Sequence, residues 1–247
     1  MPEVTLHVLA IQNDPTAPPG LVGEWLEARG VALRVVAAFA GDAVPDAVPA
    51  DVDALLSLGG EMGALSDDAA PWLPAERALL RDGVARDVPI LGLCLGGQLL
   101  AAALGGRVGP SVVGEAGVVE MTATADVAGD PAFGSLAGRS VRAAQWHLDA
   151  VEELPSGATL LLSNEACPVQ AFRVGGFAWG LQFHPEVDAD IVESWVSDDA
   201  PLVAAGVSSS DAVEQVREAY AELVATWRPV IDSWVDVIAQ QVASPTP

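Results

Sequence analysis

The sequence contains no lysine: the 11 basic residues among its 247 are all arginine, against 34 aspartates and glutamates. Without a lysine amine the chain cannot form a Schiff base, anchor pyridoxal phosphate or build a phosphate-binding loop that ends in lysine. The net charge of −23 leaves no basic patch of the kind that binds nucleic-acid phosphates. We therefore expect no nucleic-acid partner, and we interpret the acidity as a source of solubility in a salty or crowded cytoplasm.

Cysteines and long apolar runs are also scarce. Cys94 and Cys167 are too few for a disulfide framework. Residues 1–12 have no basic stretch ahead of an apolar one, so we expect no secretory leader. The apolar runs fall far short of the ~20 residues that a membrane helix needs. These absences predict a cytoplasmic protein without membrane contact, in which thiols stay reduced.

What the sequence does have is 51% hydrophobic residues, arranged in two alternating periods. Mostly apolar runs predict buried strands at residues 4–11, 32–39, 52–58 and 88–94. Helical spacing predicts helices at 18–29 and 72–86. Alternation of this kind is typical of an α/β fold with a mostly parallel sheet and helices on both faces. The length suits one large domain or two small ones.

After Gly106 the pattern changes to short strands separated by turn residues. We expect these strands at residues 108–124, 140–146, 158–163, 169–174 and 177–183. Helices are expected at 189–196 and from Ser210 onward, where Pro229 should kink or break a long amphipathic helix. We divide the chain into a domain at 1–190 and a C-terminal helical extension at 191–247, packed either on that domain or on a partner.

Cys94 occupies the position that points most clearly to chemistry. It lies in Gly92-Leu93-Cys94-Leu95-Gly96, between an apolar strand and an Ala/Leu-rich helix. This is the pattern of a nucleophile elbow, in which glycines two residues either side allow a tight turn. The elbow would hold the sulfur above the edge of the sheet and at the N-terminus of a helix, where the helix dipole favours the thiolate.

A thiolate nucleophile needs a base, and the base needs a residue that orients it. His184 follows an apolar strand in Gln182-Phe183-His184-Pro185-Glu186. In an extended backbone residues i and i+2 point the same way, so Glu186 can bind one imidazole nitrogen while the other faces the thiol. Cys94, His184 and Glu186 are therefore the predicted catalytic triad.

An attacked carbonyl also needs donors for its developing negative charge. The backbone N–H of Leu95, directly after the nucleophile, is the expected first donor. The Gly59-Gly60 pair ends a predicted strand, and the backbone there is the expected source of a second donor. His7, within the first strand, is expected to be a core or edge histidine. His147 follows a strand and could line the pocket, but nothing near it in sequence makes it a base.

These motifs together resemble those of the class I glutamine amidotransferases, and most closely the glutaminase part of GMP synthetase and its stand-alone relatives. The resemblance rests on Leu58-Gly59-Gly60, Gly92-Leu93-Cys94-Leu95-Gly96-Gly97-Gln98 and Gln182-Phe183-His184-Pro185-Glu186, and it extends over roughly residues 4–190. It implies a flavodoxin-like three-layer fold and a glutamine-type γ-amide substrate, with no metal or other cofactor.

The resemblance also implies roles for individual residues. Cys94 would be the nucleophile, His184 the base and acid, and Glu186 its orienting partner. The backbone amides of Gly60 and Leu95 would hold the oxyanion. Gly59 and Gln98 would contact the substrate, with Gln98 at its amino-acid end. Trp146 and His147 fall where the family has a substrate-contacting Ser/Asn-His pair, and Trp146 replaces the small polar residue. That replacement bears on whether free glutamine is the substrate.

Three functions remain open from the sequence. The first is a glutaminase that passes ammonia to a separately encoded synthetase in trans, because residues 190–247 are too few for an ATP-dependent acceptor domain. The second is a stand-alone hydrolase of γ-glutamyl amines or peptides, with Trp146 shaping the pocket. The third is a non-catalytic regulator that uses Cys94 as a redox sensor. A homo-oligomer is compatible with each of them.

Overall fold

The computed structural model describes residues 5–197 and 200–243, and over these residues nine strands form a single sheet. The spatial order is β2-β1-β3-β4-β9-β8-β7-β5-β6. The strands are β1 (His7–Gln12), β2 (Ala32–Ala37), β3 (Ala54–Ser57), β4 (Ile90–Leu93), β5 (Arg107–Ala123), β6 (Ser140–Glu153), β7 (Thr159–Ser163), β8 (Ala171–Val174) and β9 (Ala178–Leu181). The helices are α1 (Gly20–Ala28), α2 (Leu73–Ala85), α3 (Leu95–Ala103), α4 (Ala189–Trp195), α5 (Ala200–Ala205) and α6 (Ser209–Ala243).

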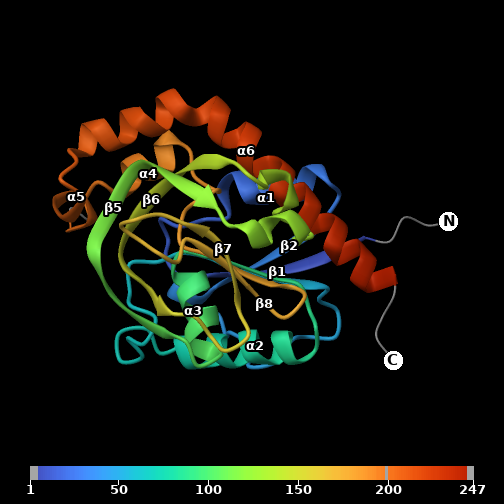
Figure 1. Cartoon of the computed structure of the whole chain (residues 1–247). Helices are drawn as coiled ribbons and strands as arrows, with labels where there is room; N and C mark the ends of the chain where they lie inside the picture. Colours follow the sequence, from blue (N-terminus) through green and yellow to red (C-terminus); the bar gives the residue numbers. More distant parts are fainter. Residues whose placement is uncertain (1–4, 198–199, 244–247) are drawn as a thin grey trace.

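Helices cover both faces of the sheet, as an α/β sequence pattern requires. Helices α1 and α6 contact one another, as do α2 and α3, and Figure 1 shows the two pairs on opposite sides of the strands. Successive β1 residues alternate between two hydrophobic clusters: Val8 packs in the cluster with α1 and α6, and Leu9 in the cluster with α2 and α3. The α/β three-layer fold expected from the sequence is thus confirmed.

The sheet divides into a parallel and an antiparallel part. Strands β2, β1, β3, β4 and β9 run parallel to one another. The pairs β9–β8, β8–β7, β7–β5 and β5–β6 are antiparallel. Because the carboxyl ends of the parallel strands meet at one edge, the turns that follow β3, β4 and β9 come together there.

Strand β5 has nearly the bounds expected from the sequence, 108–124, whereas β6 continues seven residues beyond the expected 140–146. They form one long hairpin in which Gly109, Pro110 and Gly114 lie inside β5 instead of ending it. The register shifts between Pro110 and Glu115, as happens at a β-bulge. A bulge accommodates proline and glycine without ending a strand.

Helix α6 continues through Pro229, so of the kink or break expected there the break does not occur. The helix changes direction along its length in Figure 1, and it crosses the molecule over α1 and the hairpin of β5 and β6. Its buried face includes Trp227, Ile231 and Trp234. Burial of this face stabilises the helix even though the proline removes one hydrogen bond.

The expected strand at residues 4–11 begins, within the described chain, at His7, whose side chain is exposed at the start of β1. Val4 lies outside the described residues. None of the helices in residues 5–197 and 200–243 combines the length and the apolar character that a bilayer crossing requires.

Candidate active site

Cys94 lies at the junction of β4 and α3 with a positive φ of 49°. That backbone conformation is strained for a residue with a side chain, and strain of this kind concentrates at functional sites. Its backbone N–H donates to the Leu181 carbonyl of β9 at 2.8 Å, which ties the junction to the neighbouring strand. Leu95 is the first residue of α3, where a backbone N–H has no acceptor within the helix.

The glycines around Cys94 are required by close contacts. A Cβ atom on Gly92 would lie 2.6 Å from the Gly96 carbonyl oxygen, and one on Gly96 would lie 2.0 Å from the Ser57 carbonyl oxygen. Real Cβ atoms do not approach backbone this closely. The turn can therefore form only with glycine at both positions, as expected for a nucleophile elbow.

The Gly59-Gly60 turn after β3 lies against the same site. A Cβ on Gly59 would be 3.5 Å from His184 Cε1 and 3.9 Å from Cys94 Cβ, so this backbone faces both side chains. A Cβ on Gly60 would be 3.1 Å from Leu95 Cδ2. The two segments expected to supply oxyanion donors are therefore neighbours.

His184 and Glu186 form a buried pair beside Cys94. His184 Nδ1 and Glu186 Oε1 are 2.7 Å apart, and both side chains are less than 5% exposed. The sequence pattern predicted the contact between His184 and Glu186, but these residues do not lie in an extended strand as expected. Strand β9 ends at Leu181, and His184 is held by its N–H bond to the Ala144 carbonyl at 2.9 Å.

The charges around His184 favour its imidazolium form. Burial alone would lower the pKa of His184, but the negative charges of Glu186 and of the Cys94 thiolate outweigh burial and raise it to about 10. The Nε2 atom is buried and has no hydrogen-bond partner within the described residues. At neutral pH, then, the imidazolium carries an N–H that is free to be donated.

Two tryptophans form an aromatic wall next to His184. The ring of Trp195, on α4, lies 4.7 Å from the His184 ring and 6.0 Å from the Trp146 ring. Trp195 Nε1 donates to the Thr16 carbonyl at 2.8 Å, whereas Trp146 Nε1 is buried without a partner in the described part of the chain. The sequence singled out Trp146 but not Trp195, since nothing local to α4 indicates that it reaches the site.

Gln98 and His147 both line the pocket, but their polar atoms are engaged within the protein. Gln98 Nε2 donates to the Asp149 carbonyl at 2.9 Å and to Gln182 Oε1 at 3.2 Å. His147 Nδ1 lies 3.1 Å from the same carbonyl. The substrate contacts expected of these two side chains therefore stay predictions, and their observed bonds are internal.

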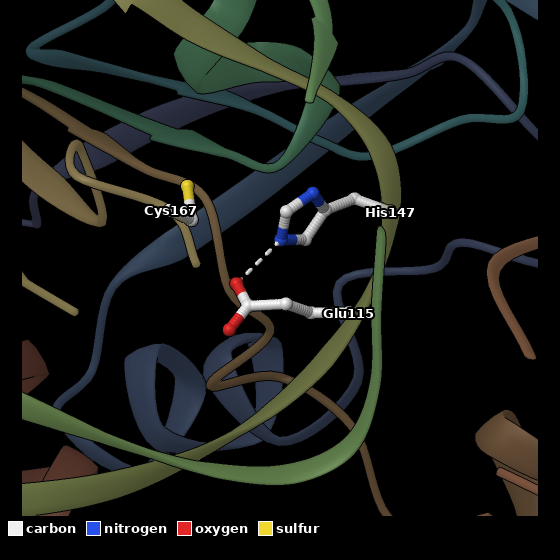
Figure 2. Close-up of side chains that lie close together, drawn as sticks. All are labelled: Glu115, His147 and Cys167. Carbon is white, nitrogen blue, oxygen red and sulfur yellow. Dashed lines mark hydrogen bonds and ion pairs between the residues drawn. The ribbon is translucent and has the colours of Figure 1, made fainter. Parts of the chain in front are cut away.

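His147 Nε2 lies 3.0 Å from Glu115 Oε2, as Figure 2 shows. A backbone carbonyl only accepts hydrogen bonds, so Nδ1 must carry a proton. The same Glu115 oxygen also accepts from Gln170 at 2.6 Å. Sequence reasoning missed this partner because Glu115 lies on the opposite strand of the hairpin.

Glu115, His147 and Cys167 are the described residues that could together hold a metal ion, since their ligand atoms lie within 4.8 Å of one another (Figure 2). Their donor atoms are already used, however. Asn164 donates to the other Glu115 oxygen at 2.7 Å. Burial and the charge of Glu115 raise the pKa of the Cys167 thiol to about 12, so it stays protonated. The cluster is best described as a closed hydrogen-bond network.

A further buried carboxyl lies beneath the Gly59-Gly60 turn. Glu76 of α2 is fully buried, and its Oε1 accepts from Ser57 Oγ at 2.6 Å and from Asn13 Nδ2 at 3.3 Å. Asn13 Nδ2 also donates to the Leu58 carbonyl at 3.1 Å. Burial outweighs these hydrogen bonds and raises the pKa of Glu76 to about 7.

These elements enclose a pocket of about 390 Å³, large enough for an amino-acid side chain and its backbone groups. Cys94, Gln98, Trp146, His147 and His184 line it together with Gly60. Its described lining contains no arginine, and the carboxylate-bearing residues in it are Asp14, Glu61 and Asp149.

Comparison with known proteins agrees with this geometry. Residues 50–194 match the family model of class I glutamine amidotransferases. The chain is 42% identical over 102 residues to one of the subunits of the glutamine-hydrolyzing GMP synthase of Natronomonas pharaonis, a match covering 41% of this chain and 54% of that protein. The chain thus spans about half the length of such relatives, and the corresponding protein from Thermococcus kodakarensis matches over 52% of its length.

Longer matches have the same character. A glutamine amidotransferase-like protein of Salmonella typhimurium is 30% identical over 77% of this chain and 80% of its own length. A glutamine amidotransferase structure from Thermotoga maritima superposes with a TM-score of 0.82 at 26% identity, covering 95% of this chain and 100% of that one. One from Methylobacillus flagellatus has a TM-score of 0.79 at 27% identity, with 94% of each chain covered.

Because the family model matches more than half of the sequence and the Salmonella relative aligns along most of both chains, this protein belongs to the class I glutamine amidotransferase family.

Proposed function

We propose that this protein hydrolyses the γ-carboxamide of glutamine through a covalent thioester and passes the ammonia to a separately encoded synthetase. The main support for the proposal is that a candidate nucleophile and a candidate base lie side by side at one pocket. Cys94 stands at a strained strand-to-helix junction, and the buried His184–Glu186 pair lies directly beside it.

In the first half of the reaction, the Cys94 thiolate attacks the γ-carbonyl carbon of the substrate. The developing oxyanion is held by the backbone N–H groups of Leu95 and Gly60, which lie on adjacent segments. The C–N bond then breaks, and the His184 imidazolium donates its Nε2 proton to the leaving nitrogen, which departs as ammonia. The raised pKa of His184 supports this role, since the proton is present at neutral pH.

In the second half, the thioester no longer carries the negative charge of the thiolate. The pKa of His184 therefore falls, because one of the two charges that raised it is gone. Neutral His184 takes a proton from water as the water attacks the thioester. Glutamate leaves, and the thiolate and imidazolium are restored. Glu186 keeps Nδ1 protonated and the ring in place throughout.

The relatives from Natronomonas and Thermococcus are named as subunits of a GMP synthase, and this supports a synthetase partner in trans for this chain. An acceptor of ammonia is then needed outside the glutaminase fold. The domain division at residue 190, with a C-terminal extension, is part of this proposal, as is a possible role of the extension in meeting the partner.

A second candidate is a stand-alone hydrolase of γ-glutamyl amines or peptides. It is favoured by the aromatic wall: Trp146 stands where the family has a small polar residue, and it packs with Trp195 beside His184. The apolar wall would suit a leaving group larger than ammonia. The chemistry of Cys94, His184 and Glu186 would be unchanged, because only the leaving nitrogen differs.

The test is steady-state release of ammonia and glutamate from glutamine by the purified full chain, with Cys94→Ala as the control. Turnover that disappears in Cys94→Ala supports the glutaminase. Turnover of γ-glutamyl amines with none of glutamine selects the second candidate. Full cellular function of Cys94→Ser would contradict both candidates, because it would show that the function does not depend on this thiol.

A synthetase that co-purifies with the protein would separate the first candidate from the second. If the chain alone is inactive on both substrate classes but becomes active with that synthetase, the glutaminase proposal stands and the partner switches it on. Inactivity on both substrate classes in the presence of the synthetase would refute the glutaminase.

A further inference from the structure

The sulfur of Cys94 receives a hydrogen bond from a side chain to which the mechanism above gives no role. Gln182 Nε2 lies 3.6 Å from Cys94 Sγ, within hydrogen-bond distance for sulfur. Gln182 is 3% exposed and follows the last residue of β9. His184 also lies close enough for Cys94 to raise the pKa of its imidazole, so the Gln182 amide is a second group that acts on the sulfur.

The orientation of this amide is set by its neighbours. Gln98 Nε2 donates to the Asp149 carbonyl, which can only accept. The same NH2 group donates to Gln182 Oε1 at 3.2 Å. With its oxygen directed at Gln98, the Gln182 amide must present its NH2 group to Cys94.

The Asp149 carbonyl, at which these hydrogen bonds begin, also accepts a hydrogen bond from His147. His147 Nδ1 donates to the Asp149 carbonyl, and Glu115 holds His147 Nε2 (Figure 2). The Gln182 backbone is fixed as well, because its N–H donates to the Gln170 carbonyl at 2.8 Å. Because the Asp149 carbonyl can only accept hydrogen bonds, the Gln98 and Gln182 amides can each take only one orientation.

We propose that Gln182 acts directly on the nucleophile: its N–H stabilises the thiolate of Cys94, and Gln98 is the positioning residue that sets the Gln182 amide. The proposal rests on Cys94 being the nucleophile of the proposed function. Hydrogen bonds to an ionised acceptor are among the strongest in proteins, and they favour the charged form over the neutral one. The buried surroundings strengthen this bond further.

The experiment measures the rate at which iodoacetamide alkylates Cys94 in the full chain between pH 5 and pH 10, followed by intact mass. Cys94→Ala gives the background from Cys167. Gln182→Met removes the donor, and Gln182→Glu also places a negative charge beside the sulfur. At pH 7 we expect alkylation to slow about tenfold in Gln182→Met and more in Gln182→Glu, with the pH midpoint moving upward.

Gln215→Leu is the control. Gln215 lies on α6 and its Oε1 accepts from the Val118 N–H at 2.9 Å, so it is not among the residues that hold Gln182. This variant should alkylate with the native pH profile. A native profile in folded Gln182→Met and Gln182→Glu would overturn the proposal.

Gln98→Met tests the positioning step, and it decides the matter if the Gln182 variants do not fold. We expect a smaller upward shift of the alkylation midpoint, because the Gln182 amide is freed and not removed. An unchanged midpoint with a raised KM for substrate would instead assign Gln98 to substrate binding and overturn its positioning role. Alkylation needs no substrate, so absence of glutamine turnover would count against the proposed function without affecting this readout.

Discussion

At the residue scale, the site is built from groups whose neighbours determine their charge. The pKa of His184 is raised because Glu186 and the Cys94 thiolate supply negative charge that outweighs burial. The pKa of the Cys167 thiol is raised by burial with an anion nearby. Two buried cysteines in one protein are therefore expected to differ in reactivity, with Cys94 facing a pocket and Cys167 enclosed in a hydrogen-bond network.

The Glu186→Gln variant tests the His184–Glu186 pair. We expect kcat to fall roughly 10²- to 10⁴-fold, because the imidazole loses the partner that fixes its orientation and tautomer. Loss of the negative charge also lowers the pKa of His184, so the basic limb of the kcat/KM profile should move to lower pH. Steady-state rates from pH 6 to 10 would measure both effects.

Glu193→Gln, an exposed change on the neighbouring helix α4, is the control and should behave as the native chain does. A Glu186→Gln variant with native kcat would show that the pair is structural.

At the element scale, helices on both faces of the sheet support the turns that carry the site. Helix α2 places Glu76 under the Gly59-Gly60 turn through Ser57. Helix α1 begins with the Leu21 N–H donating to the Glu186 carbonyl at 2.8 Å. Trp227 of helix α6 packs against Phe183, with ring centroids 4.4 Å apart. Phe183 directly precedes His184.

Glu76 should make the stability of the fold depend on pH. The pKa of this carboxyl is about 7 in the folded chain against an ordinary 4.5, so the folded state holds its proton more tightly. The free energy of unfolding contributed by this group is complete below pH 4.5 and is lost as pH rises through 7. Relative to Glu76→Gln, the native chain should lose about 3 kcal/mol over that range.

Urea unfolding of the two proteins at pH 4.5, 6 and 8 measures this difference. Glu24→Gln, an exposed change on α1, should not reproduce it. A native chain and a Glu76→Gln variant with parallel pH dependence would contradict the prediction.

Helix α6 should stabilise both the fold and the position of His184. Trp227 is 1% exposed, and its Nε1 donates to the Arg142 carbonyl at 3.1 Å. Trp227→Ala should cost about 3–5 kcal/mol of the free energy of unfolding through the cavity it creates. Because Phe183 loses its support, kcat should fall in the fraction that remains folded.

Tyr220→Ala, a change at a 43% exposed position on the same helix, is the control and should cost less than about 1 kcal/mol. Denaturant unfolding together with activity at low temperature would separate the two effects of Trp227→Ala. Native activity in the folded Trp227→Ala fraction would show that α6 serves stability alone.

At the scale of the whole molecule, the net charge of −23 acts against compactness. The structure offsets part of it with arginine–carboxylate pairs, such as Arg77–Asp67 at 2.7 Å and Arg173–Asp130 at 2.8 Å. With 11 arginines for 34 carboxylates, arginine can offset only part of the negative charge.

Salt should therefore stabilise this protein. Raising NaCl from 0.05 to 1 M shortens the Debye length from roughly 14 Å to 3 Å and screens the repulsion among carboxylates. We expect Tm to rise by several degrees, measured by differential scanning calorimetry at pH 7. Choline chloride at equal ionic strength should act similarly if screening is the cause. Full stability and activity in low salt, with loss of both in high salt, would contradict the prediction.

The sequence by itself determined the features that depend on neighbours along the chain. The strand–helix alternation, the glycines around Cys94 and the His184–Glu186 spacing are local patterns, and they were enough to predict the α/β fold and the family. The glycine requirement could be anticipated because a tight turn excludes Cβ atoms whatever surrounds it.

Only the tertiary structure decided the contacts between residues far apart in sequence. The order of strands in the sheet determines the hydrogen bonds from Gln98 to Gln182 and from Gln182 to Cys94. It also determines the Glu115–His147 pair and the position of Trp195. Tertiary packing also outweighed local preferences. Strand β5 continues past Pro110 at a bulge, and α6 continues past Pro229 because its apolar face is buried. Local patterns cannot specify such features, because the free energy that stabilises them comes from burial against distant parts of the chain.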